Sequence, residues 1–261
     1  MEVVILPDAA EIGRVASDAI GALLTRQPTA VLGLATGSSP VAIYDELAAR
    51  CEAGLISFAQ ARGFTLDEYV GLPVDHPERY RNVIDAVFVS RVDYAPGAVA
   101  GPDGSAPDIP AACAAYENAI RDAGGVDLQI LGIGTDGHIA FNEPGSSLAS
   151  RTRIKTLTRQ TRVDNARFFD GDVDAVPTHC LTQGLATIMA ARHVILVATG
   201  RNKAEAVHHM VEGPVSAMWP ASILQHHPHA TVLLDDSAAR RLQLADYFRE
   251  TYRSKPDWQG I

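Results

Sequence analysis

The hydrophobic residues of this chain fall into two alternating patterns. Continuous apolar runs rich in Val, Ile and Leu, typical of strands buried on both faces, occupy residues 3–6, 30–35, 63–66, 126–133, 193–199 and 230–234. Apolar residues at helical spacing predict helices over residues 9–25, 40–53, 79–92, 109–123, 203–212 and 237–252. This alternation indicates an α/β fold: a three-layer, open, mostly parallel sheet of Rossmann-like type with helices on both faces.

The domain organisation follows from the length and regularity of the chain. Its 261 residues contain no internal repeat, low-complexity tract or linker, so we expect one domain over residues 1–261. The segment 150–179 has the least regular pattern. It contains a candidate active-site lid around residues 157–177.

Composition narrows the class of protein. The net charge of −9 and the pI near 5.4 argue against a nucleic-acid or anionic-membrane partner. Cys51, Cys113 and Cys180 are odd in number and widely spaced, which indicates free thiols in a reducing compartment. The N-terminus lacks a signal-peptide pattern, and no window approaches about 18 continuous apolar residues. A cytoplasmic protein is therefore expected.

Loops that follow predicted strands carry most of the candidate chemistry, because parallel strands bring such loops to one edge of the sheet. The loop Thr36-Gly37-Ser38-Ser39-Pro40 precedes a predicted helix, where free backbone N–H groups suit a phosphate. An ordinary turn with Ser as the helix N-cap is the alternative. Asp67 lies at the carboxyl end of the strand 63–66, in the loop that follows it, and is a candidate general base, unless it belongs to a solvated acidic loop.

The richest loop runs from Leu131 to Gly145. It places Asp136, His138 and Glu143 after the strongest strand, and a carboxylate beside an imidazole supports an acid/base relay. A structural histidine in a tight turn is the alternative. Residues 132–137 also spell G-x-G-x-x-G, but a Pro-Gly pair at 144–145 interrupts the helix that a dinucleotide-binding site requires. Dinucleotide binding is therefore disfavoured.

Several basic residues are candidates for anion binding. Lys203 starts a predicted helix, where the dipole disfavours a cation unless an anion lies between them; a surface lysine is the alternative. Arg151, Arg153 and Lys155 alternate along an extended segment, as in an anion site or a solvated strand edge. The histidines at 208, 209, 226, 227 and 229 are interpreted as surface residues, and no metal site is expected.

Together, these motifs resemble the glucosamine-6-phosphate deaminases of the glucosamine/galactosamine-6-phosphate isomerase family. The resemblance rests on residues 36–40, 67–72 and 132–144 and extends through 146–156, 165–169 and Lys203, across essentially the whole chain. Related 6-phosphogluconolactonases share the Asp-Gly-His core at 136–138. They typically continue toward Ser-Leu-Phe-Pro, where this chain has Phe-Asn-Glu-Pro at 141–144, and carry Asp-Glu-Arg, where this chain has Asp-Glu-Tyr at 67–69.

The resemblance implies a hydrolase of amino-sugar catabolism that converts glucosamine 6-phosphate to fructose 6-phosphate and ammonia without a metal or an organic cofactor. His138, supported by Asp136 and Glu143, would open the sugar ring. Asp67 would then move a proton from C2 to C1. The residues expected to hold the substrate are Thr36, Gly37, Ser38, Ser39, Arg167 and Lys203.

The same resemblance raises the question of regulation. Some family members are hexamers that N-acetylglucosamine 6-phosphate activates at a subunit interface, so we expect a homo-oligomer, and a hexamer if the protein is allosteric. The positions that match the effector site are Ser146, Arg153, Lys155, Thr156 and Tyr247. A 6-phosphogluconolactonase-type sugar-phosphate hydrolase and a non-catalytic sugar-phosphate sensor are the alternative functions.

Overall fold

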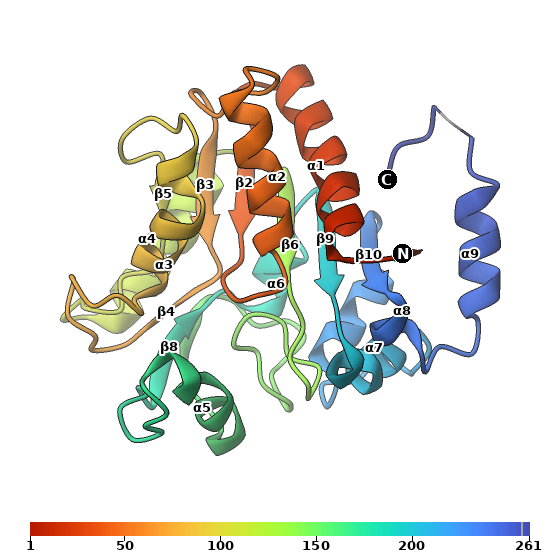
Figure 1. Cartoon of the computed structure of the whole chain (residues 1–261). Helices are drawn as coiled ribbons and strands as arrows, with labels where there is room; N and C mark the ends of the chain where they lie inside the picture. Colours follow the sequence, from red (N-terminus) through yellow and green to blue (C-terminus); the bar gives the residue numbers. More distant parts are fainter. Residues whose placement is uncertain (257) are drawn as a thin grey trace.

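The fold is built on a central parallel sheet. A computed structural model describes residues 1–256 and 258–261, and within them the main sheet has seven strands, all parallel, in the order β1-β10-β9-β6-β2-β3-β5 (Figure 1). The strands are β1 (Glu2–Leu6), β2 (Val31–Leu34), β3 (Arg62–Thr65), β5 (Val99–Ala100), β6 (Leu128–Leu131), β9 (His193–Ala198) and β10 (Ala230–Asp235). The predicted α/β architecture is confirmed.

Helices cover the sheet between its strands. The chain passes from β1 to β2, β3 and β5 in one direction and returns through β6, β9 and β10 in the other. Because parallel crossovers are right-handed, the outgoing and the returning helices pack on opposite faces. Figure 1 shows α1 and α2 side by side in front of the strands. The longer helices are α1 (Ala9–Arg26), α2 (Val41–Glu52), α3 (Tyr80–Val87), α4 (Ile109–Asp122), α7 (Ala204–Val211) and α9 (Ala245–Arg253).

The reversal of direction opens a crevice between β2 and β6. These two strands are hydrogen-bonded neighbours, but β2 continues to β3 on one side and β6 continues to β9 on the other. Their following loops therefore diverge at the carboxyl edge of the sheet. Open α/β sheets bind ligands at such a point.

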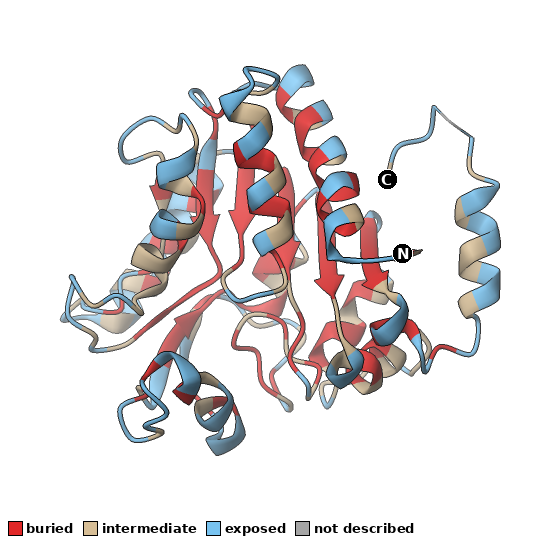
Figure 2. Cartoon of the chain, viewed as in Figure 1, coloured by how far each residue is buried: buried red, intermediate tan, exposed pale blue. Residues whose placement is uncertain are grey.

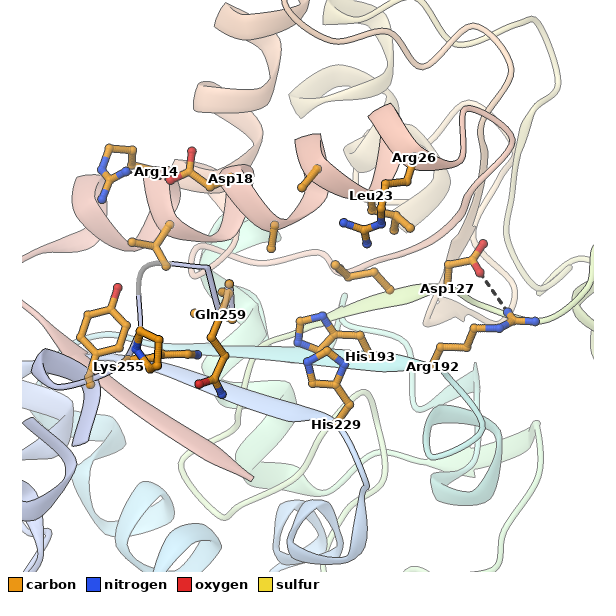
Figure 3. A pocket seen from close by; sticks show the side chains of 18 of the residues that line it. Arg14, Asp18, Leu23, Arg26, Asp127, Arg192, His193, His229, Lys255 and Gln259 are labelled. Atoms are coloured by element: carbon orange, nitrogen blue, oxygen red, sulfur yellow. Dashed lines mark hydrogen bonds and ion pairs between the residues drawn. The ribbon is translucent and has the colours of Figure 1, made fainter.

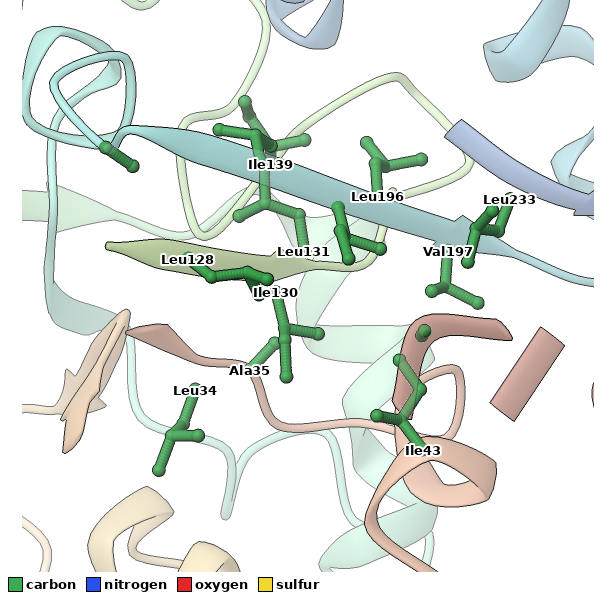
Figure 4. Packing of buried hydrophobic residues seen from close by; sticks show 14 of the residues in the cluster. Leu34, Ala35, Ile43, Leu128, Ile130, Leu131, Ile139, Leu196, Val197 and Leu233 are labelled. Carbon is green, nitrogen blue, oxygen red and sulfur yellow. The ribbon is translucent and has the colours of Figure 1, made fainter. Parts of the chain in front are cut away.

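The core is continuous beneath this edge. All six residues of β9 are buried, and the strands are largely buried along their length, whereas helices such as α1 are buried on one side only (Figure 2). Leu34, Ile130 and Leu196 come from three neighbouring strands and belong to one hydrophobic cluster (Figure 4). Burial of each such side chain stabilises the fold by about 1.5–3 kcal/mol, so the loops above it start from a rigid base.

A second sheet, which the hydrophobic pattern did not predict, lies beside the first. It is antiparallel and has the strand order β4-β8-β7. Its strands are β4 (Asp67–Tyr69), β7 (Arg153–Thr156) and β8 (His179–Thr182). Asp67 follows the carboxyl end of β3, as expected, but it begins the buried strand β4 and does not lie in a solvated acidic loop. The segment 150–179 is also more regular than expected, since it contains β7, α5 (Arg159–Asn165) and η2 (Ala166–Phe168).

The ends of the chain differ from expectation in one respect. Asp8 caps α1 by accepting from the Glu11 backbone N–H at 2.9 Å, as predicted. The single terminal helix expected over 237–252 is instead two helices, α8 (Asp236–Ala239) and α9.

No helix among the described residues is both long and apolar enough to cross a membrane. The shorter elements are η1 (Val89–Arg91), α6 (Leu185–Ile188), η3 (Arg201–Lys203) and η4 (Pro220–His226).

Candidate active site

A cavity of about 590 Å³ lies at the carboxyl edge of the main sheet, where the predicted loops come together. It is bordered by the loops after β2, β6 and β9, by the start of β4, and by α3, α5 and η2. The predicted site residues that line it are Thr36, Gly37, Ser38, Ser39, Asp67, His138, Arg167 and Lys203. Asp136 and Glu143 do not line the cavity; they lie behind His138.

One part of the cavity is suited to an anion. In the turn between β2 and α2, Gly37 has φ +96°, a conformation that glycine adopts without strain. The N-cap residue of α2 is Pro40, and no side-chain hydrogen bond caps the start of the helix. The alternative of a serine N-cap in this turn is therefore not observed. The first backbone N–H groups of α2 are therefore not satisfied by a capping side chain, and such groups at a helix start suit a phosphate.

Two cations from other elements line the same cavity as this turn. Lys203 is the N-cap residue of α7, and Arg167 lies in η2. Burial lowers the pKa of Lys203; Asp164 opposes this effect, and Arg167 adds to it. Two neighbouring cations, one of them beside a helix N-terminus, repel each other unless an anion lies between them. The arrangement therefore favours a doubly charged group such as a phosphate.

The loop after β6 holds His138 between two carboxylates. Its Nδ1 lies 2.7 Å from Asp136 Oδ1 and 3.6 Å from Glu143 Oε2. The Asp136 carboxylate also accepts from the His138 backbone N–H at 3.2 Å. Glu143 is buried, and its Oε1 accepts from Thr161 Oγ1 of α5 at 2.5 Å. The catalytic loop is thus connected directly to the candidate lid.

These neighbours change the protonation of the imidazole. Burial alone lowers the pKa of His138, but the contacts with Asp136 and Glu143 outweigh it and raise the pKa to about 9. In return, although burial opposes the effect, His138 holds the pKa of Asp136 below its usual range. His138 is consequently an imidazolium at neutral pH, ready to donate a proton, while Asp136 stays ionised.

Asp67 has the opposite character. It is 6% exposed and borders the same cavity as His138. Burial, and then the charge of Glu68, raise the pKa of Asp67 to about 8, while the nearby positive charge of His138 opposes them. A carboxyl group with a pKa near the working pH is suited to accept and return a proton. Asp67 and His138 are thus two separate candidate proton-transfer groups on one cavity.

Glu68, next to Asp67, has a structural task. Its carboxylate accepts from the backbone N–H groups of Tyr69, Tyr80 and Arg81 at 2.9–3.0 Å. It therefore caps the start of α3, which forms one wall of the cavity. Because the Glu68 carboxylate is engaged in these three hydrogen bonds, Asp67 is the better candidate for proton transfer.

A metal ion has a geometrically acceptable site in the same place. Asp136, His138 and Glu143 each offer one ligand atom, and these atoms lie within 4.8 Å of one another. The three side chains also interact directly with one another, which matches an acid/base relay. The expectation that no metal takes part remains a prediction.

The candidate effector residues are only partly brought together. Arg153 and Lys155 are partly buried on one side of β7, whereas Ile154 between them is 45% exposed. The Ser146 hydroxyl is buried and has no hydrogen-bond partner among the described residues. Tyr247 is 60% exposed on α9, which Figure 1 places across the molecule from β8, the partner strand of β7. Within one chain, Tyr247 does not join this group.

The basic residues in and beside β7 differ in the partners that they contact. Arg151 pairs with Glu117 of α4 at 2.5 Å, so its charge is already compensated. Arg153 Nη1 instead donates to Asn142 Oδ1 at 2.9 Å, beside Glu143 in the catalytic loop. Thr156, at the end of β7, is exposed. Arg153 is thus the member of this group with a direct contact to the active site.

Sequence reasoning missed an aromatic cluster that supports the cavity. Tyr69 packs against Tyr80, Phe141 and Phe169, with ring centroids 4.8–5.9 Å apart. Its hydroxyl also accepts from Asn165 Nδ2 of α5 at 2.9 Å. The motif at 67–69 contained Tyr69, but no local signal indicated that this tyrosine contacts the lid.

A larger cavity, of about 880 Å³, lies at the opposite, amino-terminal edge of the sheet, between α1 and the C-terminal residues (Figure 3). Several of its charges are already paired: Arg192 with Asp127 at 3.0 Å and Lys255 with Glu2 at 2.6 Å. It contains none of the predicted site residues. The prediction that the histidines lie at the surface was wrong for His227, which is buried and hydrogen-bonded to the Ala191 carbonyl.

Comparison with known proteins identifies the family. Residues 9–233 match the family described as glucosamine-6-phosphate isomerases/6-phosphogluconolactonase. The chain belongs to this family. A glucosamine-6-phosphate deaminase of Mycolicibacterium smegmatis is 81% identical over 261 residues, with 100% of both chains covered. One from Streptomyces coelicolor is 60% identical over 261 residues, again with 100% of both chains covered.

Solved structures of the family agree with the fold. A monomeric glucosamine-6-phosphate deaminase superposes with a TM-score of 0.89 at 40% identity, over 92% of this chain and 99% of that one. The 6-phosphogluconolactonase from Trypanosoma cruzi superposes with a TM-score of 0.74 at 21% identity, over 93% of this chain and 97% of that one. The latter shows the shared fold alone. The resemblance to the deaminases is thereby confirmed.

Proposed function

We propose that this protein is a glucosamine-6-phosphate deaminase, which forms fructose 6-phosphate and ammonia. The observation that carries the proposal is that Asp67 and His138 line one cavity together with the Gly37 turn, Arg167 and Lys203. The relatives at 60–81% identity support the same substrate. Incubation of the purified protein with glucosamine 6-phosphate should release ammonia and form the ketose phosphate. Absence of both products would refute the proposal.

The first step is the opening of the sugar ring. The phosphate lies among the α2 N-terminus, Arg167 and Lys203, which fixes the sugar relative to the loop after β6. His138, charged at neutral pH, donates a proton to the ring oxygen as the bond from C1 to that oxygen breaks, and the neutral imidazole then accepts the proton of the C1 hydroxyl. Asp136 and Glu143 hold the imidazole in place and support its charged form.

The second step moves a proton along the open chain. The ionised form of Asp67 removes the proton from C2 while the His138 imidazolium protonates the C1 oxygen, and the Asp67 carboxyl group then returns its proton to C1, which gives a C2 iminium ion. Water adds to this iminium ion and passes a proton back to the imidazole, and the resulting carbinolamine loses ammonia to leave fructose 6-phosphate. Each group that transfers a proton contributes about 10²–10⁴-fold to the rate. The reaction needs an acid and a base, which this site provides.

The two alternative functions are less well supported. A 6-phosphogluconolactonase would hydrolyse its lactone and leave glucosamine 6-phosphate unchanged, so both substrates should be tested in one experiment. A sugar-phosphate sensor would bind without turnover. It would have no use for a carboxyl group buried at a cost in stability beside a charged imidazole.

The region 157–177 would act as a lid over the bound sugar. It carries Arg167. Its Thr161 hydroxyl donates a hydrogen bond to the Glu143 carboxylate, and its Asn165 amide donates one to the Tyr69 hydroxyl. A lid that combines a phosphate ligand with a contact to the catalytic loop would link substrate binding to closure. The lid and the cytoplasmic location both remain predictions.

Regulation by N-acetylglucosamine 6-phosphate would use Ser146, Arg153, Lys155 and Thr156. The support is the unpartnered buried hydroxyl of Ser146 and the contact from Arg153 to Asn142. An effector phosphate that binds Arg153 would compete with Asn142 and so act on the catalytic loop. The Arg153→Ala variant should lose activation by this ligand. A wild-type enzyme whose rate does not respond to the ligand would refute the idea.

The oligomeric state is part of the same proposal. Tyr247 could complete the effector site only if α9 of another copy reached β7, so regulation of this kind requires a homo-oligomer such as a hexamer. The 40% identical relative is described as monomeric. Light scattering with and without N-acetylglucosamine 6-phosphate would decide between a monomer and an oligomer.

A further inference from the structure

Trp219 lies against the backbone of the catalytic loop. Gly137, between Asp136 and His138, has φ +82°. A Cβ atom on Gly137 would come within 2.6 Å of Trp219 Cε3. The indole therefore touches the Gly137 backbone directly, and no side chain fits between them. Trp219 does not line the substrate cavity as the structure describes it, so it supports the loop from behind.

The segment around Trp219 also holds this loop at two points, on either side of His138, by backbone hydrogen bonds. The Ala221 N–H donates to the Gly137 carbonyl at 2.9 Å, and the Gly145 N–H donates to the Ala217 carbonyl at 2.8 Å. Residues 216–219 form a turn of their own, which is closed by a hydrogen bond from the Trp219 N–H to the Ser216 carbonyl at 3.0 Å. The loop that carries His138 is thus clamped on either side of Trp219.

The indole is held in turn by α7. The His209 ring stacks on it with the ring centroids 4.0 Å apart and the planes 14° from parallel. His209 Nε2 lies 3.1 Å from Glu205 Oε1, one turn earlier in α7. Stacked aromatic pairs contribute about 0.5–1.5 kcal/mol beyond the area that they bury. Trp219 therefore sits between α7 and the Gly137 backbone, in contact with both.

We propose that Trp219 is a positioning residue for the proposed deamination, which keeps the His138 imidazole between Asp136 and Glu143 by fixing the backbone at Gly137. The inference rests on the proposed role of His138. Trp219 is not among the residues that line the cavity with the α2 turn, Arg167 and Lys203, so its effect falls on ring opening and not on phosphate binding.

The test compares Trp219→Ala with Trp219→Phe. A displacement of about 1 Å in a catalytic group can cost about 100-fold in rate, so Trp219→Ala should lower kcat by roughly tenfold to 100-fold and change KM less than about threefold. Trp219→Phe should restore most of kcat. The Trp258→Phe variant is the control, because Trp258 is 84% exposed and is the other tryptophan of the chain.

A second readout separates positioning from a loss of folding. In Trp219→Ala, the pKa of His138 measured by NMR should fall from about 9 toward its ordinary value of 6.5, because the imidazole leaves its carboxylates. The alkaline limb of kcat/KM should move with it. His209→Ala should shift the His138 pKa and the alkaline limb in the same direction by a smaller amount, whereas His209→Phe should shift neither. If Trp219→Ala does not fold, the two His209 variants provide the test in its place.

Three results would overturn the inference. One is an active wild-type enzyme whose Trp219→Ala variant keeps its kcat and pH profile. Another is an unchanged His138 pKa in that variant. The third is a rise in KM with kcat preserved. A wild-type protein that releases no ammonia from glucosamine 6-phosphate would instead refute the proposed function. The NMR measurement would still test the position of His138 in that case.

Discussion

Replacing Asp67 with Asn should stabilise the protein while it abolishes turnover. The Asp67 carboxyl group has a pKa of about 8 in the folded protein and a reference value of 3.8. Between these values the folded chain holds a proton that the unfolded chain releases. Stability therefore falls as pH rises through this range. The amide side chain of the variant has no such proton, so the variant lacks this dependence.

The size of the effect follows from the same two values. Each pH unit between them costs the wild-type protein about 1.4 kcal/mol. From pH 5 to pH 7, the free energy of unfolding of Asp67→Asn should therefore rise by about 3 kcal/mol relative to wild type. Comparing the two pH values removes any constant difference in packing between Asp and Asn. Groups that titrate alike in both proteins cancel as well.

Urea denaturation of both proteins at pH 5, 6 and 7 measures this difference. Asp246→Asn is the matched control, because the Asp246 side chain is fully exposed and its replacement removes the same formal charge. Assays of ammonia release should show kcat lowered by roughly 10²–10⁴-fold in Asp67→Asn, as expected for loss of a general base. If the stability difference between Asp67→Asn and wild type were the same at all three pH values, Asp67 would not hold a buried proton, and the reasoning would fail.

Four further predictions concern the rest of the site. Initial rates from pH 6 to pH 10 should give a narrow bell for kcat/KM, rising through the Asp67 pKa near 8 and falling through the His138 pKa near 9. Glu143→Gln should move the falling limb to lower pH, because one carboxylate that raises the His138 pKa is lost. Lys203→Ala should raise KM for the sugar phosphate by roughly tenfold to 100-fold, since a hydrogen bond to a charged group is worth about 1.5–3 kcal/mol. Tyr69→Phe should speed amide hydrogen exchange in α5 about fivefold, equivalent to one lost hydrogen bond of about 1 kcal/mol.

The main sheet was predictable because its signal is local. Strands such as β9 are buried on both faces and consist of uninterrupted apolar residues. Their order along the chain, combined with right-handed crossovers, brings the loops after β2 and β6 to one edge. The loop residues Gly37 and His138 could therefore be placed on a common site from the sequence pattern alone.

The second sheet was not predictable in the same way. β4 has three residues, and its partner β8 is far away in the sequence. β7 carries cations at the positions that face inward, so it shows no hydrophobic alternation. Strands this short are stabilised by pairing with distant segments, which a local pattern of residues does not record.

The chemistry of Asp67 depends on that less predictable part. The sequence pattern placed a carboxylate after β3, and a carboxylate in a solvated loop would have an ordinary pKa and remain ionised at neutral pH. In the structure, Asp67 pairs with Thr182 of β8, and its burial there raises its pKa. The position of the proposed base could thus be predicted from a local motif, whereas its proton affinity comes from a pairing between distant strands. Substitutions in β8 that expose Asp67 should therefore impair catalysis without altering any residue of the motif.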